Sequence, residues 1–539
     1  MGMRCESSGN IFARADSPRM FVSSSLLSAL GFFLPVISII PVVFAACTFN
    51  PHGLKAEDRD SGVSDGATDA LILDVVTEDG SHEDRATLCE EGEFRCENEL
   101  RSASICRDGK WFSLGYCFLG CEEASSSCRV PSNVDPEILG FEESSLGHLD
   151  LPAGVEVEID TSTGMVLNTT DASVLRGEGE GSVVDGIGFY RRSQPGDAPS
   201  LGVFILKDLF VPEDTQVVVV GSGALVILAA GHVTFLGSLD GGAWGARGGA
   251  GGFDGGRIGL PGEGPCPGYT GQFHPICPDG CASGSGGGGF GGFGGSGGPV
   301  DCTVQGGTGV HVAGGFGGGS GDDKCGTPEL IPLLGGSGGG AGVPLYGQGG
   351  SEPGLGGGGG GAVQISARAS LFLGEQCVIT TPGGGGRQTF SGGGSGGGAG
   401  GGILLESGSL FFSTTSLLSA NGGGGGAGDC MIDSNDVGQG GERGKNGDLQ
   451  AMGGDNTSNL AGGIGGGGAY SGEVSGEVGG SRCLPDQGSN GGGGGGGGGR
   501  IRLNIGGEPF IPPAAVFSPQ PDTSGFSMGP IKTKPLFSP

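Results

Sequence analysis

The residues of this chain that could do chemistry are few, and the motifs around them are incomplete. Gly294–Gly298 matches the spacing of a nucleophile elbow around Ser296, but no strand and helix flank it to aim the serine. Gly440–Asn446 imitates a phosphate-binding loop. It lacks the first glycine, where Gln439 stands, and the magnesium-binding hydroxyl, which Asn446 replaces. With 130 glycines in 539 residues, such motifs arise by chance, so neither predicts catalysis or nucleotide binding.

Metal-binding patterns are also missing from the sequence. The six histidines contain no pair at ligand spacing; they are His52, His82, His148, His232, His274 and His311. His82-Glu83 lacks the second histidine of a zinc protease helix. The aspartates do not recur every nine residues, as calcium-binding β-rolls require. We therefore expect no metal site and no cofactor.

A polysaccharide lyase or hydrolase is the catalytic alternative. Such enzymes need clustered carboxylates, and a lyase also needs an arginine or lysine base. The charged residues on the predicted strands are Arg368, Glu375, Glu406 and Arg502. We expect them at different corners of different repeats rather than in stacked positions. The sequence therefore favours a protein that is not an enzyme and has no catalytic residues.

The cysteines predict disulfides. The chain has 16 cysteines, of which Cys5 lies in the signal segment and Cys47 at its end. The other 14 are Cys89, Cys96, Cys106, Cys117, Cys121, Cys128, Cys266, Cys277, Cys281, Cys302, Cys325, Cys377, Cys430 and Cys483. An even count of 14 in an exported body is typical of a crosslinked protein. The six in residues 87–130 allow fifteen pairings. A zinc site is disfavoured there, because Cys117-x3-Cys121 has no second matching pair and no nearby histidine.

The N-terminal segment predicts export. Residues 21–46 are uncharged and apolar after a weakly basic stretch, which is the layout of a signal peptide over residues 1–46. The segment ends in Val43-Phe44-Ala45-Ala46-Cys47, which resembles a bacterial lipobox with Cys47 as the lipidated residue. Phe44 departs from the usual aliphatic residue, so cleavage after Ala45 without lipidation, or a retained anchor, stays open. We expect an exported protein, extracellular or anchored to the outer membrane.

The charge balance limits the partners. The chain has 58 acidic and 27 basic residues, a net charge of −31. Nucleic-acid affinity depends on Lys and Arg that neutralise phosphates, so we exclude nucleic-acid binding. Membrane contact is expected only through a lipidated Cys47. Residues 47–86 are polar and acidic, and we interpret them as a tether.

A repeat of three short aliphatic strands gives the fold. Apolar and polar residues alternate in residues 135–240, which predicts β-strands. Repeats of about twenty residues begin near Val203, Leu225, Val363, Ile403 and Ile501. This length is that of one coil of a three-sided parallel β-helix. We therefore predict an all-β chain: a right-handed parallel β-helix-like solenoid, β-rich over 135–240 and interrupted over 241–518. A small disulfide-rich module precedes it, and a Pro-rich tail over 519–539 follows.

Glycine lies between these repeats. Residues 241–500 hold 100 of the 130 glycines, in inserts over 241–361, 383–402 and 422–499. The inserts fall at one corner of each coil, so they would project from one side. Two alternatives remain for them: packed left-handed threefold helices, which the absence of Cβ permits, or flexible linkers. The cysteines inside the inserts favour partial order.

The strand and glycine pattern over residues 140–518 resembles glycine-rich bacterial cell-surface lipoproteins. The segments that carry the resemblance are GGGGGGAVQISARASLFLGEQCVITTPGGGG and GAGGGILLESGSLFFSTTSLLSANGGGGG. Residues 87–130 are similar to small cysteine-rich modules of such proteins. The resemblance implies an envelope location and a β-helix with polyglycine inserts.

These observations predict a non-catalytic structural or adhesive protein of the cell envelope or extracellular matrix, which presents a glycine-rich surface. Its partners would be envelope or matrix glycans or other surface proteins. The second hypothesis is a polysaccharide-binding module that uses the flat glycine faces or the aromatic cluster Trp111 and Tyr116. Alternatively, these aromatic side chains form a minimal apolar core of the cysteine module.

Overall fold

The computed structural model describes residues 89–97, 102–275, 281–303, 309–319, 325–344, 354–389, 392–428, 438–455, 462–481 and 490–536. The expected all-β fold is confirmed, because these residues form strands together with two 3-10 turns at Pro136–Leu139 and Glu143–Ser145. No helix in these ranges is long and apolar enough to cross a membrane. The predicted signal peptide, tether and Cys47 lie outside the described residues.

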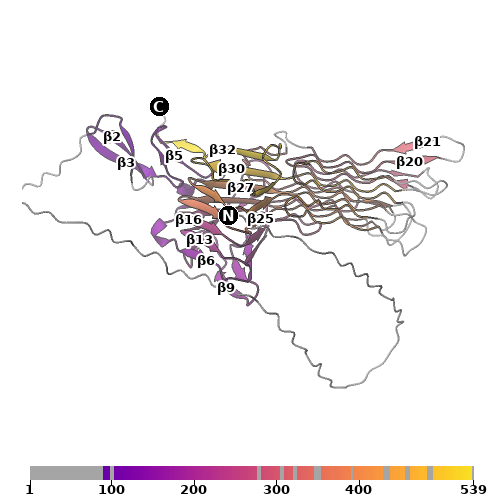
Figure 1. Ribbon diagram of the computed structural model, residues 1–539, viewed down its shortest axis with the longest axis horizontal. Helices are drawn as coiled ribbons and strands as arrows, with labels where there is room; N and C mark the ends of the chain where they lie inside the picture. The colour runs from indigo at the N-terminus through magenta and orange to yellow at the C-terminus, as the bar shows by residue number, and fades with distance from the viewer. Residues whose placement is uncertain are drawn as a thin grey trace, which may run out of the picture. The chain divides into compact units, whose positions relative to one another are not determined.

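Three sheets of mainly parallel strands form the body of the protein (Figure 1). The first sheet contains β12 (Leu201–Leu206), β15 (Ala224–Ala229), β23 (Ala362–Ala367), β27 (Gly402–Ser407), β30 (Arg500–Ile505) and β32 (Phe526–Pro530). The second contains β6 (His148–Asp150), β13 (Asp208–Val211), β16 (His232–Phe235), β24 (Ser370–Leu373) and β28 (Leu410–Phe412). The third contains β7 (Glu156–Asp160), β14 (Gln216–Val220), β17 (Ser238–Asp240), β25 (Val378–Thr380), β29 (Leu417–Ser419) and β31 (Val516–Ser518).

Consecutive strands of the chain belong to the first, second and third sheets in a fixed order. β12, β13 and β14 follow one another in the first, second and third sheets, and β15, β16 and β17 pair onto them in parallel. β23–β25 and β27–β29 repeat the order. Aligned aliphatic residues therefore form columns, such as Ile227, Ile365, Leu405 and Leu503 on the first sheet.

One apolar core fills the space between the three sheets. Alternate residues of each short strand point inward, and the columns bury Leu371, Ile379 and Ile365 completely. Each such side chain contributes roughly 1.5–3 kcal/mol relative to an exposed one. One repeat has no partner for its inner face, so burial requires neighbouring repeats to stack.

The first sheet is buried on both faces. Its outward side chains, including Val203 and Val226, belong to one buried cluster with Phe118 and Leu119 of the cysteine module and Leu139 of the segment that follows it. This explains why β12 and β15 read as continuous apolar runs rather than alternating ones. The cysteine module itself contains β1 (Phe94–Glu97), β2 (Ser102–Arg107), β3 (Lys110–Tyr116), β4 (Cys121–Glu122) and β5 (Ser127–Arg129).

Antiparallel strands cover one end of the stack. β8 (Val166–Asn168) and β9 (Ser173–Arg176) extend the third sheet beyond β7, while β10 (Ser182–Val184) and β11 (Ile187–Arg192) extend the first sheet beyond β12. The turned strands cover edges that would otherwise expose unpaired backbone groups. Residues 519–539, which we expected to be a tail, hold β32 and β33 (Thr533–Pro535), and β33 pairs with β5.

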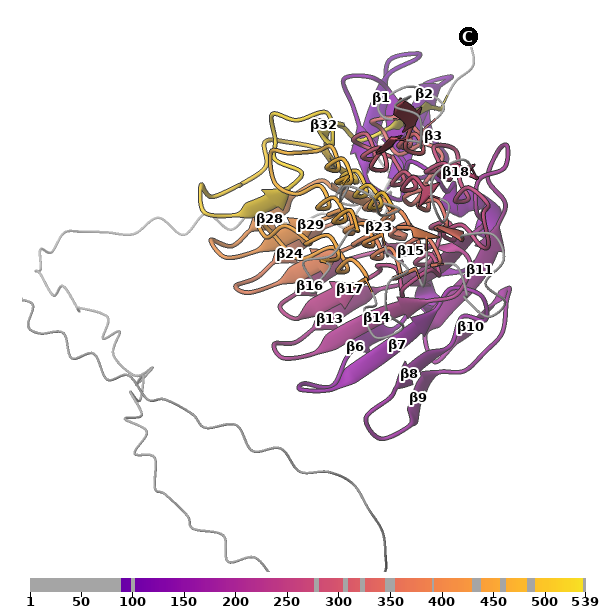
Figure 2. The same cartoon turned by 90° about the vertical axis from the view of Figure 1, so that its right-hand side faces the viewer.

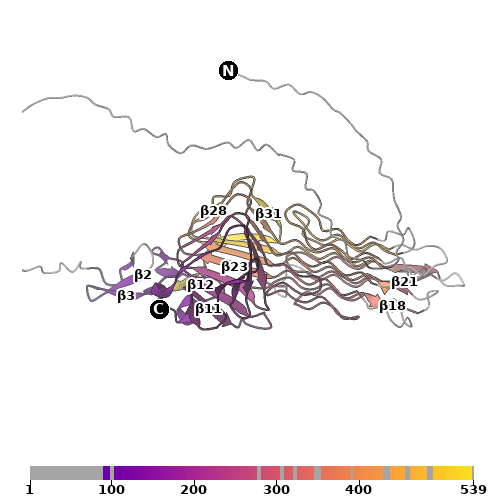
Figure 3. The ribbon, with the colours of Figure 1, turned by 90° about the horizontal axis from the view of Figure 1, so that it is seen from below.

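The glycine-rich segments leave the stack after the third sheet and return to the first. They connect β17 to β23, β25 to β27 and β29 to β30, and they run side by side away from the sheets (Figures 1 and 3). Figure 2 views them end-on, as a set of small coils in front of the sheets. Short strands lie along them: β18 (Phe273–His274), β19 (Cys281–Ala282), β20 (Val300–Thr303), β21 (Gly309–Val312), β22 (Val343–Pro344) and β26 (Gly392–Gly393).

Candidate functional site

The glycine segments form a hydrogen-bonded array centred on Gly491–Gly499. Successive N–H groups of this tract donate in rotation to carbonyls of residues 282–288, 474–480 and 420–426, at N···O distances of 2.7–2.9 Å. Its carbonyls accept bonds from residues 291–298, 394–400 and 466–469. The tract therefore has six neighbours. A rotation with period three is that of the polyproline II conformation, which has three residues per turn and no internal hydrogen bonds.

The spacing of the array requires glycine. A Cβ built on Gly495 would lie 1.9 Å from the carbonyl oxygen of Gly467, and one on Gly496 would lie 1.9 Å from that of Gly398. Real side chains cannot approach backbone so closely, so only hydrogen can occupy these positions. For the described residues, this favours the ordered alternative over free linkers. We call this set of segments the glycine array.

The predicted disulfides are confirmed at nine of the fourteen candidate cysteines. The pairs in the cysteine module are Cys89–Cys106, Cys96–Cys121 and Cys117–Cys128. Cys266–Cys325 joins two parts of the glycine array, and Cys281 is also disulfide-bonded. Cys302 lies on β20. Cys277, Cys430 and Cys483 lie outside the described residues.

The prediction that Cys377 forms a disulfide is wrong, because this cysteine carries a free, buried thiol. It precedes β25 and belongs to the apolar core between the sheets, with no exposed surface. Burial raises the pKa of the thiol to about 12, because the low-dielectric core disfavours the thiolate. The signal that sets Cys377 apart is its position in a repeat, since the array disulfides lie in the glycine inserts.

Three of the four charged residues considered for catalysis lie on the first sheet or directly after one of its strands, which corrects the expectation of different corners. They are not stacked on one another, as expected, because Glu406 pairs with Ser366 and Asn504, and Arg502 pairs with Leu404. Arg368 follows β23, Glu406 lies on β27 and Arg502 lies on β30. Glu375 lies apart from them, exposed before β25. The signal that could have placed them on one sheet is the alignment of the repeats that begin near Val363, Ile403 and Ile501.

Glu406 is fully buried and accepts hydrogen bonds from five donors. These are the Ser132 N–H and hydroxyl, the Gln364 amide at 2.8 Å, the Ser366 hydroxyl at 2.8 Å and the Asn504 amide at 2.9 Å. The carboxylate therefore has no face open to solvent. This geometry ties the segment after the cysteine module to the first sheet.

Arg368 reinforces the same junction. Its guanidinium donates to the Phe118 carbonyl at 2.6 Å and to the Glu143 carboxylate at 2.9 Å, and it lies 4.4 Å from the centre of the Tyr116 ring. Tyr116 is thus engaged in packing. Trp111 of the same predicted cluster lies under Arg95, at 3.9 Å.

Four phenylalanines form an exposed row on the second sheet, which sequence analysis missed. Phe210 pairs with Thr234, Thr234 with Phe372, Phe372 with Phe411, and Phe411 with Phe510. The four rings are between 37% and 63% exposed. We call Phe210, Phe372, Phe411 and Phe510 the phenylalanine ladder. The sequence signal for it is an aromatic residue at the outward-facing middle position of β13, β24 and β28, where β16 has Thr234.

A polar row runs beside the phenylalanine ladder. Asp208 accepts bonds from the His232 N–H at 2.6 Å and pairs with His148 at 2.9 Å, and the His232 ring contacts the Ser370 hydroxyl at 2.8 Å. None of these contacts forms a metal site, and the described ranges contain no group of three or more metal-ligating side chains.

Comparisons with protein-family models, with curated proteins and with solved structures found no match to this chain.

Proposed function

We propose that the chain is a right-handed parallel β-helix whose polyglycine inserts form a rigid slab. It would serve as an exported, non-catalytic structural or adhesive protein. The fixed order of the strands through three parallel sheets supports the solenoid, because consecutive repeats pair in register. Right-handedness follows the strong preference of parallel crossover connections.

The observation that carries the structural role is the hydrogen bonding of the glycine array. Gly491–Gly499 uses its backbone groups on six neighbours, so the slab is held by main-chain bonds rather than by a side-chain core. Such a surface offers flat backbone for close contact and few groups for chemistry. The nine disulfide-bonded cysteines support an oxidising compartment. Lipidation of Cys47 remains a prediction from the sequence.

Complementation of a deletion strain tests the structural role. Cells that lack the protein should attach or cohere less, and the wild-type chain should restore attachment. A chain carrying Gly495→Ala, which disrupts the array, should fail, whereas Gly177→Ala should succeed because a Cβ on Gly177 meets nothing within 4 Å. Unchanged attachment in the deletion strain would overturn the proposal.

The phenylalanine ladder favours polysaccharide binding as the second candidate function. An apolar row beside a polar row suits an extended sugar chain, whose C–H faces stack on aromatic rings while its hydroxyls bond polar groups. Pull-down on insoluble polysaccharides tests this. The double variant Phe372→Ser/Phe411→Ser should lose binding, and Val174→Ser, at an exposed apolar residue of β9, should retain it.

A further inference from the structure

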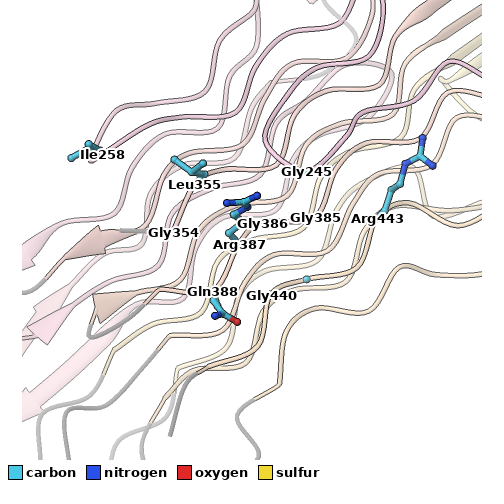
Figure 4. Close-up of a pocket in the computed structure, with 11 residues that line it drawn as sticks. Gly245, Ile258, Gly354, Leu355, Gly385, Gly386, Arg387, Gln388, Gly440 and Arg443 are labelled. Carbon is cyan, nitrogen blue, oxygen red and sulfur yellow. The ribbon is translucent and has the colours of Figure 1, made fainter. Parts of the chain in front are cut away.

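A pocket of about 670 Å³ opens on the glycine array (Figure 4). Glycines of several segments form much of its lining, and Ile258 and Leu355 supply apolar side chains. The described residues of the lining include two arginines, Arg387 and Arg443, and no carboxylate. This is notable in a chain of net charge −31. The volume is within the range of about 300–1,000 Å³ that is typical of small-molecule sites.

The two arginines are in different states. Arg443 is neutralised, because its guanidinium forms two bonds of 2.6 and 2.8 Å with the Asp240 carboxylate. Arg387 is exposed, and its guanidinium makes no hydrogen bond or ion pair with the residues that the structure describes. Figure 4 shows it between Leu355 and Gln388. Within the described part of the chain, the positive charge of Arg387 is therefore not neutralised by a carboxylate.

The backbone adds donors beside this charge. In the outer tracts of the array, the threefold rotation directs every third N–H away from neighbouring segments. Gly384 and Gly386 donate to Gly358 and Gly424, but the Gly385 N–H between them has no acceptor among the described residues. The Gly440 N–H has none within those residues either. Both glycines line the pocket.

We propose that this pocket binds an acidic saccharide through its oxyanion, a uronic acid carboxylate or a sulfate ester. A guanidinium pairs with an oxyanion through two parallel N–H bonds, and free backbone N–H groups complete anion sites. Trp244 is 60% exposed and lies against Arg443, 5.2 Å from the guanidinium to the ring centre. Its indole offers a stacking face for the sugar ring beside the anion.

This site is independent of both functions proposed above. The structural role depends on the hydrogen bonds inside the array, in which the Arg387 side chain takes no part. The phenylalanine ladder lies on the second sheet rather than on the glycine array. The variant Phe372→Ser/Phe411→Ser should therefore leave binding at the pocket unchanged, so failure of one proposal is distinguishable from failure of another.

Calorimetry on the full chain tests the site with three sets of probes. The acidic probes are a tetragalacturonate and a sulfated oligosaccharide. The uncharged control is the methyl ester of the tetragalacturonate, and the free-anion controls are acetate and sulfate. We expect one of the acidic oligosaccharides to bind, and the ester and the free anions to bind at least about tenfold more weakly, because charge-assisted hydrogen bonds carry the affinity.

The variant Arg387→Gln should weaken that binding about tenfold or more, while its melting temperature stays that of the wild type. Arg191→Gln, at an exposed arginine of β11, is the matched control and should bind normally. The proposal is overturned if neither acidic oligosaccharide binds, or if Arg387→Gln binds as tightly as the wild type. Equal affinity for the ester or for a free anion overturns it as well.

Discussion

The Ser132 N–H donates to the Glu406 carboxylate at 3.2 Å, across 274 residues of sequence. Both residues are buried, at 4% and 0% exposure. Ser132 lies just after the cysteine module, and Glu406 lies on β27 in the middle of the first sheet. The bond therefore fastens the start of the described chain to a strand that forms only after two glycine inserts.

Glu406→Gln should destabilise the fold by at least about 2 kcal/mol, because its new amide would face buried donors that then lack an acceptor. The change in free energy of unfolding is measured by guanidinium denaturation. Glu375→Gln is the matched control at an exposed position and should stay within about 0.5 kcal/mol of wild type. Equal effects of the two substitutions would contradict the structural role of Glu406.

Gly495→Ala should destabilise the glycine array by at least about 2–3 kcal/mol, because overpacking forces backbone shifts. The added Cβ would meet the Gly467 carbonyl at 1.9 Å. Gly177→Ala, in open space, should be neutral or slightly stabilising. Hydrogen exchange of the array amides provides the measurement, and unchanged protection in Gly495→Ala would show that the tract is not packed.

Removing the Cys266–Cys325 disulfide with Cys266→Ser/Cys325→Ser should cost about 4 kcal/mol. The estimate comes from loop-closure entropy for a separation of 59 residues. Thermal melting of the double variant, compared with the wild type with and without reductant, checks this. A double variant that melted at the temperature of the oxidised wild type would contradict this contribution.

The Cys377 thiol should resist alkylation in the native protein. Burial raises its pKa from near 9 to about 12, so at pH 8.5 the folded state holds it as an unreactive thiol. The stability that this preference contributes is complete below pH 9 and is lost as the pH rises toward 12. Peptide mapping after iodoacetamide treatment should find Cys377 labelled only when the protein is first unfolded. Native labelling would contradict its burial.

Sequence analysis predicted the repeats because they carry side chains. The aligned aliphatic residues at Val203, Leu225 and Val363 fall on paired strands of the first sheet. The glycine tracts carry no pattern that sets their partners, so the six neighbours of Gly491–Gly499 could not be derived. The Glu406 junction was missed for a related reason: its donors are distant in sequence and lie in three other repeats or segments.

The backbone bonding of Gly491–Gly499 has a consequence for digestion. An endoprotease recognises side chains and draws an extended segment into its cleft, where it forms new main-chain hydrogen bonds. This tract has no side chains to recognise, and its amides are already bonded to six neighbours. Cleavage would require several surrounding segments to separate first. The slab should therefore persist in protease-rich surroundings where an equally glycine-rich but unpaired chain would be cut.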